Sequence, residues 1–166
     1  DPTSLVNGAY THSIQLETSS FHGIEPHLSL AYNSQAGNGF VGVGWSLSGI
    51  STIERAQPNH GAPKYDGSDI YYLDGVELIP CAGGSNRNSP SCTATESGGE
   101  NFTTQIEDFT RINLDSTAST WTVWQRDGTK TIYSSVLTSS EYGETIRWGI
   151  TTVRARDGVN VVNYHW

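Results

Sequence analysis

The sequence predicts a nearly all-β fold, in which short antiparallel strands form a hairpin-rich sandwich or a curved, shell-like sheet with little or no helix. Asn-Gly and Asp-Gly pairs recur along the chain, and such pairs favour the tight turns that join antiparallel strands. Short alternating or apolar runs lie between these pairs, without convincing helical periodicity. The composition is rich in Gly, Ser, Thr, Asn, Tyr and Trp, which suit strands and turns rather than helices.

The individual strands are predicted from these runs. Residues 10–17 and 27–33 alternate apolar and polar side chains, as half-buried strands do, and another strand restarts within residues 45–55. Residues 101–114 hold one or two strands. Three hairpins are predicted with these turns and flanks: Asp74-Gly75 between 70–73 and 76–79, Asp127-Gly128 between 120–126 and 130–136, and Asp157-Gly158 between 146–156 and 159–166.

Further turns are predicted at Asn7-Gly8, Asn38-Gly39 and Asp66-Gly67. The last two hairpins of the chain resemble each other, because both carry Arg-Asp-Gly followed by an alternating run that ends in Tyr133 or Tyr164. Two such copies hint at a repeating hairpin architecture.

Residues 1–166 are predicted to form a single domain, because this length suits one core and no internal linker is visible. The one long polar segment, from about Pro80 to Glu100, is expected to be a mobile loop. Cys81 and Cys92 bound part of it and predict a local disulfide and an oxidising compartment, with two free thiols as the alternative. A metal site at the two cysteines is less favoured, because no neighbouring His pair completes a tetrahedral shell.

A glycine-rich loop at residues 36–45 contains the spacing G-x-G-x-x-G at Gly37, Gly39 and Gly42. Dinucleotide-binding loops of this spacing need a helix that starts at the third glycine. Residues 43–52 hold two more glycines and several β-branched residues, so no helix and no cofactor are expected here. Glycines in such a turn supply positive φ and let another backbone or a large ring come close.

The charge of the chain excludes several partners. Its net charge is −8, its pI is near 4.9, and its nine Lys and Arg residues are scattered along the sequence. This charge argues against nucleic acid, and it disfavours anionic membranes and sulfated polymers unless a local basic patch overrides it. No run is long and apolar enough to span a bilayer, and no membrane insertion is expected. The chain contains no Met, so we expect it to begin inside a longer precursor or after processing.

No constellation of catalytic residues is visible, and the chain is not expected to be an enzyme. Asp66, Asp69 and Asp74 are weak candidates for a Ca²⁺ site, but their spacing does not fit a calcium loop and turn-forming roles are favoured. Ser46 misses the spacing of a nucleophile motif by one residue. Asn101 begins a glycosylation triplet, a pattern that often occurs by chance.

Aromatic residues offer a second function, because exposed rings can form a flat platform for sugars. The candidates are Trp121, Trp124, Trp148, Tyr71, Tyr72 and Tyr133. Trp121 and Trp124 are an odd number of residues apart, so on a regular strand one faces the core while the other faces outward. Rings used only in packing are the favoured alternative to a sugar platform.

Residues 24–55 carry a longer pattern: Pro26, Leu28, Leu30, Tyr32 and Ser34 on one run, then Gly37-Asn38-Gly39, then Gly42, Gly44, Trp45 and Leu47. This pattern resembles the N-terminal SpvB-type domain family of bacterial virulence proteins, which also opens the B component of insecticidal toxin complexes and occurs in Rhs/YD-repeat proteins. Residues 71–80, 109–112, 123–133 and 147–166 resemble the later strands of the family more loosely.

The resemblance implies a secreted, non-catalytic structural domain, which forms part of a β-shell and packs on neighbouring domains or toxin-complex subunits. In the virulence proteins of this family, ADP-ribosyltransferase activity lies in a separate C-terminal domain. The paired Glu-x-Glu of such transferases is absent here, since Glu141 and Glu144 are three apart. The final strand, ending at Trp166, would present an edge to the next domain. The cysteine-bounded loop departs from the family and raises the alternative of a free-standing secreted protein, and a carbohydrate-binding module of a secreted enzyme is the other alternative function.

Overall fold

The computed structural model describes residues 8–39, 41–82, 88–92 and 98–166. Apart from two single 3-10 turns, η1 (Pro58–His60) and η2 (Pro90–Cys92), all regular structure in these residues is β. The chain divides into two compact units, Asp1–Ile50 and Ser51–Trp166, and each is described by itself. The all-β prediction is confirmed, and the single-domain assignment stays a prediction.

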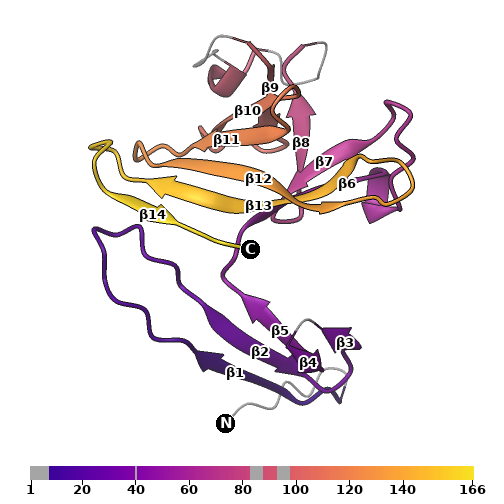
Figure 1. The fold of residues 1–166 in the computed structure, drawn as a ribbon, viewed down its shortest axis with the longest axis vertical. Coiled ribbons are helices and arrows are strands. Elements are labelled where there is room, and N and C mark those ends of the chain that lie inside the picture. The colour runs from indigo at the N-terminus through magenta and orange to yellow at the C-terminus, as the bar shows by residue number, and fades with distance from the viewer. Residues whose placement is uncertain (1–7, 40, 83–87, 93–97) are drawn as a thin grey trace. The chain divides into compact units, whose positions relative to one another are not determined.

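The first unit contains a three-stranded antiparallel sheet in the order β1 (Thr11–Gln15), β2 (Ser29–Asn33) and β5 (Trp45–Ser48) (Figure 1). These strands form where the sequence alternates apolar and polar residues, as predicted. Two further short strands, β3 (Asn38–Gly39) and β4 (Gly42–Val43), pair with each other. The predicted turn at Asn38-Gly39 is therefore wrong, because these two residues are the strand itself.

The glycines of the first unit allow close approaches of backbone and ring. Gly44 has φ +77°, and a Cβ there would lie 2.6 Å from Cε2 of Tyr32. Gly49 has φ +89°, and its Cβ would overlap the carbonyl oxygen of His27. Gly42 begins strand β4, and strand β5, not a helix, comes next. The predicted role of the loop glycines is confirmed at Gly39, where a Cβ would overlap the carbonyl oxygen of Trp45, at Gly42, which has φ +125°, and at Gly44. Gly37 shows neither a positive φ nor a close neighbour.

The second unit is a closed antiparallel β-barrel (Figure 1). Eight strands follow the order β12-β11-β10-β9-β8-β7-β6-β13, and β13 pairs back onto β12. The long strand β13 closes the barrel, because it pairs with β12 along its length and also with β6 through its first half. Its second half pairs in addition with β14. The strands are β6 (Thr52–Ala56), β7 (Ile70–Leu73), β8 (Val76–Pro80), β9 (Glu100–Thr104), β10 (Arg111–Asp115), β11 (Thr120–Trp124), β12 (Lys130–Thr138), β13 (Thr145–Arg154) and β14 (Val161–Asn163).

The predicted hairpins of this unit are confirmed. Asp74 and Gly75 have φ 51° and 82° and form a two-residue turn between β7 and β8. The two Arg-Asp-Gly hairpins, β11–β12 and β13–β14, use their aspartates alike. The carboxylate of Asp127 accepts the N–H of Thr129 at 2.8 Å, and that of Asp157 accepts the N–H of Val159 at 2.9 Å. Asp66-Gly67 lies in the longer connection between β6 and β7.

Aromatic rings fill the interior of the barrel. Trp121 is fully buried, and its ring centroid lies 4.8 Å from that of Tyr71, 5.0 Å from that of Phe102 and 5.9 Å from that of Trp148. These pairs are tilted or edge-to-face, the arrangement that the ring quadrupoles favour. Trp124, an odd number of residues away on the same strand, is only half-buried, as the strand periodicity predicts.

Candidate functional site

One face of the β1-β2-β5 sheet is apolar. Strand register places Ile14 opposite Leu30 and Leu30 opposite Leu47. Side chains directly opposite each other in neighbouring strands lie on the same face of the sheet. The same register adds His12, Tyr32 and Trp45, and we call the set of His12, Ile14, Leu30, Tyr32, Trp45 and Leu47 the apolar face.

The opposite face of this sheet is polar, with Ala31 as its one apolar member. It carries Thr11, Ser13, Gln15, Ser29, Ala31, Asn33, Ser46 and Ser48. A sheet with one apolar and one polar face is built to be covered on the apolar side. The family resemblance is carried by a pattern within residues 24–55. Four residues of this pattern lie on the apolar face: Leu30, Tyr32, Trp45 and Leu47.

Aromatic contacts organise one end of the apolar face. The ring centroid of Tyr32 lies 5.2 Å from that of Trp45 and 6.1 Å from that of Tyr10. Gly44 contributes by leaving room for the Tyr32 ring, which a side chain at position 44 would displace. This explains in physical terms why glycine precedes tryptophan in the pattern.

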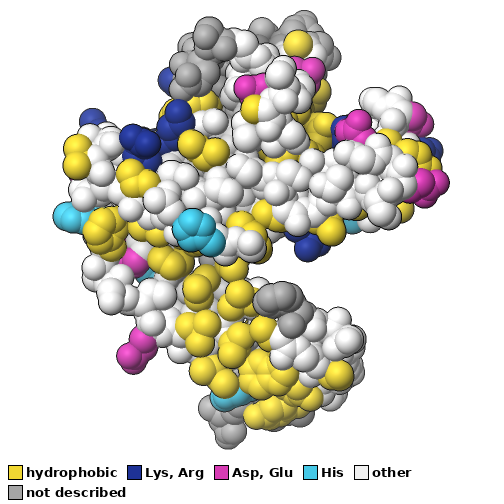
Figure 2. Space-filling model, in the orientation of Figure 1, with side chains coloured by type: hydrophobic (Ala, Val, Ile, Leu, Met, Phe, Trp, Pro, Cys, Tyr) yellow, Lys and Arg dark blue, Asp and Glu magenta, His cyan; other side chains and the backbone are white. Residues whose placement is uncertain are grey.

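The apolar face is only partly covered. Ile14 is 43% exposed, and Tyr10, which contacts Tyr32 at the end of the face, is 47% exposed. Leu30, Tyr32, Trp45 and Leu47 are half-buried. Figure 2 shows hydrophobic side chains gathered over this unit. Contiguous apolar surface of this kind marks an interaction site in proteins. The arrangement can bind another apolar surface, and it brings no reactive groups together.

The three aspartates proposed as weak metal candidates do not converge. Asp69 accepts the N–H groups of Lys64 and Tyr65, both at 2.8 Å, and the amide of Gln57 at 2.6 Å. Burial opposes ionisation of Asp69, but these hydrogen bonds prevail and lower its pKa. Asp66 accepts the N–H of Ser68 at 3.0 Å.

The third candidate, Asp74, binds the start of β6. Its carboxylate accepts the hydroxyl of Ser51 at 2.6 Å and the N–H of Thr52 at 2.8 Å. Ser51 also contacts the hydroxyl of Tyr133 at 2.8 Å, and burial raises the pKa of Tyr133 to about 12. This network joins β6, the β7–β8 turn and β12. All three carboxylates thus accept hydrogen bonds from the connections around them, and no group of three or more His, Cys, Asp or Glu in the described part of the chain could hold a metal ion.

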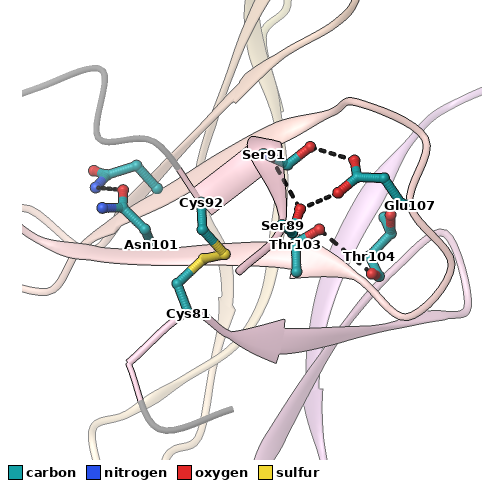
Figure 3. Close-up of a disulfide and its surroundings, with 9 residues drawn as sticks. Cys81, Ser89, Ser91, Cys92, Asn101, Thr103, Thr104 and Glu107 are labelled. Atoms are coloured by element: carbon teal, nitrogen blue, oxygen red, sulfur yellow. Dashed lines mark hydrogen bonds between the residues drawn. A yellow bond between two sulfur atoms is a disulfide. The ribbon is translucent and has the colours of Figure 1, made fainter. Parts of the chain in front are cut away.

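Cys81 and Cys92 form the predicted disulfide, with an S–S distance of 2.02 Å (Figure 3). The disulfide fixes the end of the turn η2 at Cys92. Glu107 also stabilises this turn, because its carboxylate accepts hydrogen bonds from the hydroxyls of Ser89 and Ser91. Ser91 is buried. Residues 83–87 and 93–97 of the predicted mobile loop lie outside the described residues.

The hydrogen bonds from Ser89 and Ser91 lower the pKa of Glu107. A carboxylate with a lowered folded-state pKa stabilises the protein above its unfolded pKa, and this contribution is lost as the pH falls through the folded pKa. We expect Glu107→Gln to lower the free energy of unfolding by about 1–2 kcal/mol at neutral pH. The difference from the wild type should shrink in acid. Urea unfolding at several pH values measures it, and an equal loss at every pH would contradict this role of the charge.

Most of the rings proposed for a sugar platform are buried. The interior of the barrel holds Trp121, Trp148 and Tyr133, and the ring of His60 stacks on Tyr72 at 4.0 Å. These four rings therefore form no exposed platform. Of the other proposed platform rings, Tyr71 packs among the core aromatics and Trp124 is half-buried on the outer face.

Two polar candidates also have partners. The hydroxyl of Ser46, the one serine considered as a nucleophile, donates to the carbonyl oxygen of Ala31 at 3.3 Å. Asn101 of the glycosylation triplet accepts from the Asn113 amide at 3.0 Å (Figure 3). The structure describes no helix that is long and apolar enough to cross a membrane.

The described residues thus form a closed antiparallel barrel and a three-stranded sheet with one apolar face, which is an all-β fold. Comparison with known proteins gives the family. Residues 4–166 match the family described as Salmonella virulence plasmid 65kDa B protein, SpvB. The chain belongs to this family.

Curated relatives are similar to part of the chain. The mono(ADP-ribosyl)transferase SpvB of Salmonella typhimurium is 38% identical over 74 residues, which are 44% of this chain and 12% of that protein. The protein of the same name from Salmonella enteritidis is 39% identical over the same share. The chain thus matches only about an eighth of the length of these curated relatives.

Solved structures show the same fold. The Tc holotoxin pore of Photorhabdus luminescens has a TM-score of 0.64 at 21% identity, over 89% of this chain and 7% of that chain. The TcdB2-TccC3 structure has a TM-score of 0.61 at 22% identity, over 89% and 8%. The N-terminal domain of the effector protein SpvB from Salmonella typhimurium has a TM-score of 0.60 at 24% identity, over 86% and 50%.

Proposed function

We propose that this chain is a non-catalytic structural domain of a longer, secreted toxin-like or Rhs-like protein, in which it contributes to a β-shell. The apolar face carries the proposal, because the residue pattern of the family builds it. In this role Leu30, Trp45 and Leu47 pack against a neighbouring domain or subunit. The far greater length of the similar proteins supports a place among other domains.

The polar groups support a non-catalytic role. Asp69, Asp74 and Glu107 each accept several hydrogen bonds that close turns, and a catalytic carboxylate would instead point toward a space for substrate. The transferase activity named for the relatives would then lie in a part of those proteins that this chain does not match.

A second contact with a neighbouring domain is proposed at β14. Among the described strands, β14 pairs only with β13, so its other edge offers backbone groups for a further strand. Trp166 follows β14 in the chain and packs on β13, where its indole N–H donates to the carbonyl oxygen of Ile150 at 2.8 Å and its ring covers Gly149.

A charged residue on the apolar face tests the packing role. In the longer polypeptide, Leu47→Lys is expected to uncouple this domain, so that calorimetry shows a separate transition at lower temperature. Ser46→Lys, on the polar face of the same strand, should keep the joint transition. Circular dichroism of the isolated chain checks that both variants fold. If both variants, or neither, uncouple the domain, the apolar face is not the packing surface.

A further inference from the structure

A groove of about 790 Å³ lies beside the β7–β8 hairpin of the barrel. Three parts of the chain line it: the turn η1, the β7–β8 hairpin, and the end of β9 with the connection that follows. All of these residues belong to the second unit, so the groove is separate from the apolar face, which belongs to the first. Its volume is in the range that binds a small molecule or a few residues of a peptide.

Apolar side chains line part of the groove. Ile106 is 82% exposed and Val76 is 46% exposed, while Leu73 is half-buried. Strand pairing brings these side chains to one place, because Leu73 lies opposite Val76 in the hairpin and β8 pairs with β9, which leads to Ile106. Exposed apolar side chains in a concave surface are typical of interaction sites.

The charged side chains that line the same groove are acidic. Three carboxylates belong to it, those of Asp74, Glu77 and Asp108, and no described Lys or Arg lines it. No described cation forms an ion pair with any of the three. Arg126 of the β11–β12 turn lies over the ring of Phe109, and neither residue lines the groove. The groove therefore favours a cationic ligand.

Two of these carboxylates have acceptor oxygens that the described residues leave unused. Oδ1 of Asp108 accepts the hydroxyl of Thr104 at 3.0 Å and the N–H of Thr110 at 2.9 Å. No described group donates a hydrogen bond to Oδ2 of Asp108, or to the carboxylate of Glu77. Glu77 is half-buried, so its charge is partly withdrawn from water. A cationic donor from a partner would compensate this loss of hydration.

His60 adds an exposed ring to the groove. Its imidazole stacks on Tyr72 with the ring centroids 4.0 Å apart, and it stays exposed while Tyr72 is buried. Asn59 and His60 have φ 61° and 58°, a left-handed conformation that is uncommon for residues with a side chain. The surrounding structure must impose this conformation, which keeps the ring in place. A planar guanidinium group stacks on aromatic rings, so arginine fits this surface better than lysine.

We propose that the groove binds a basic segment of a partner polypeptide that contains arginine and apolar residues. Arginine side chains pair with Glu77 and Asp108 and stack on His60, and apolar side chains of the segment cover Val76 and Ile106. A metal ion does not fit, because no group of three or more His, Cys, Asp or Glu among the described residues could hold one. This inference goes beyond the proposed structural function and does not depend on it.

The test is fluorescence anisotropy of the full chain with a labelled peptide, Arg-Arg-Leu-Leu-Arg-Arg, which we call the leucine peptide. We expect binding that weakens as salt is raised, and no binding of the same peptide with Glu in place of Arg. Glu77→Gln combined with Asp108→Asn should raise the Kd about tenfold, because both charges are removed while an oxygen remains to accept the Thr110 N–H. Asp115→Asn combined with Glu141→Gln makes the same change of net charge in other connections of the barrel, and should leave the Kd nearly unchanged.

A further variant separates the apolar contribution from the charge. Ile106→Ser should weaken binding of the leucine peptide several-fold, without affecting the same peptide with Ser in place of Leu. Circular dichroism checks that each variant folds. Absence of leucine-peptide binding, or equal losses in the two double variants, would overturn the proposal. Equal affinity of the wild type for the leucine and serine peptides would also overturn it, because charge alone would then account for the binding.

Discussion

Trp121→Ala is expected to destabilise the barrel by about 3–5 kcal/mol, the range for removing a large aromatic side chain from a core. Trp121 is fully buried and contacts three other rings, so the space left behind cannot be filled without moving Tyr71, Phe102 and Trp148 together. A loss of this size is comparable to the whole stability of many domains, about 5–15 kcal/mol. Urea unfolding followed by circular dichroism measures it.

Trp124→Ala is the matched control for this prediction, because it removes the same side chain from the same strand on the outer, half-buried face. We expect it to cost less than half as much as Trp121→Ala. Equal losses for the two variants would contradict the assignment of Trp121 to the core.

Gly49→Ala is expected to have the second-largest effect, a destabilisation of about 2–4 kcal/mol that is confined to the first unit. Two costs combine at this position. The backbone has φ +89°, which strains any residue with a Cβ, and that Cβ would overlap the His27 carbonyl oxygen. The chain would have to move away from β2 at the end of β5. Hydrogen exchange of the β2 and β5 amides should therefore accelerate.

Gly37→Ala supplies the control, since nothing lies within 4 Å of a Cβ at this position and no positive φ is required there. Its exchange rates should stay close to those of the wild type. Rapid exchange in both variants, or in neither, would show that the approach to His27 does not hold the sheet together.

Local signals in the sequence predicted most strands and hairpins, but they did not predict which strands pair across long distances in the chain. The Asp74-Gly75 turn could be predicted because Asp and Gly tolerate positive φ at adjacent positions. Closure of the barrel could not, because it depends on β13 meeting β6, where Trp148 pairs with Ile53 from far earlier in the chain. The Asn38-Gly39 turn was mispredicted because tertiary packing outweighed the turn preference of the pair.

The composition of the surfaces also depends on long-range strand pairing, which the sequence does not show. Alternation within residues 10–17 and 27–33 predicted apolar sides for single strands, but only the register unites Ile14, Leu30 and Leu47 on one face. The groove beside the β7–β8 hairpin likewise exists only once β7, β8 and β9 are aligned. Burial of Tyr72 depends on His60, which reaches it from η1.

The most direct test of the proposed packing role is hydroxyl-radical footprinting of Tyr10, Tyr32 and Trp45, in the isolated chain and in the longer polypeptide. Tyr142, which is 56% exposed on the barrel, serves as the internal reference. The proposed function predicts that oxidation of Tyr32 and Trp45, relative to Tyr142, falls several-fold in the longer polypeptide because a neighbouring domain covers the apolar face. Unchanged oxidation of both residues would contradict it.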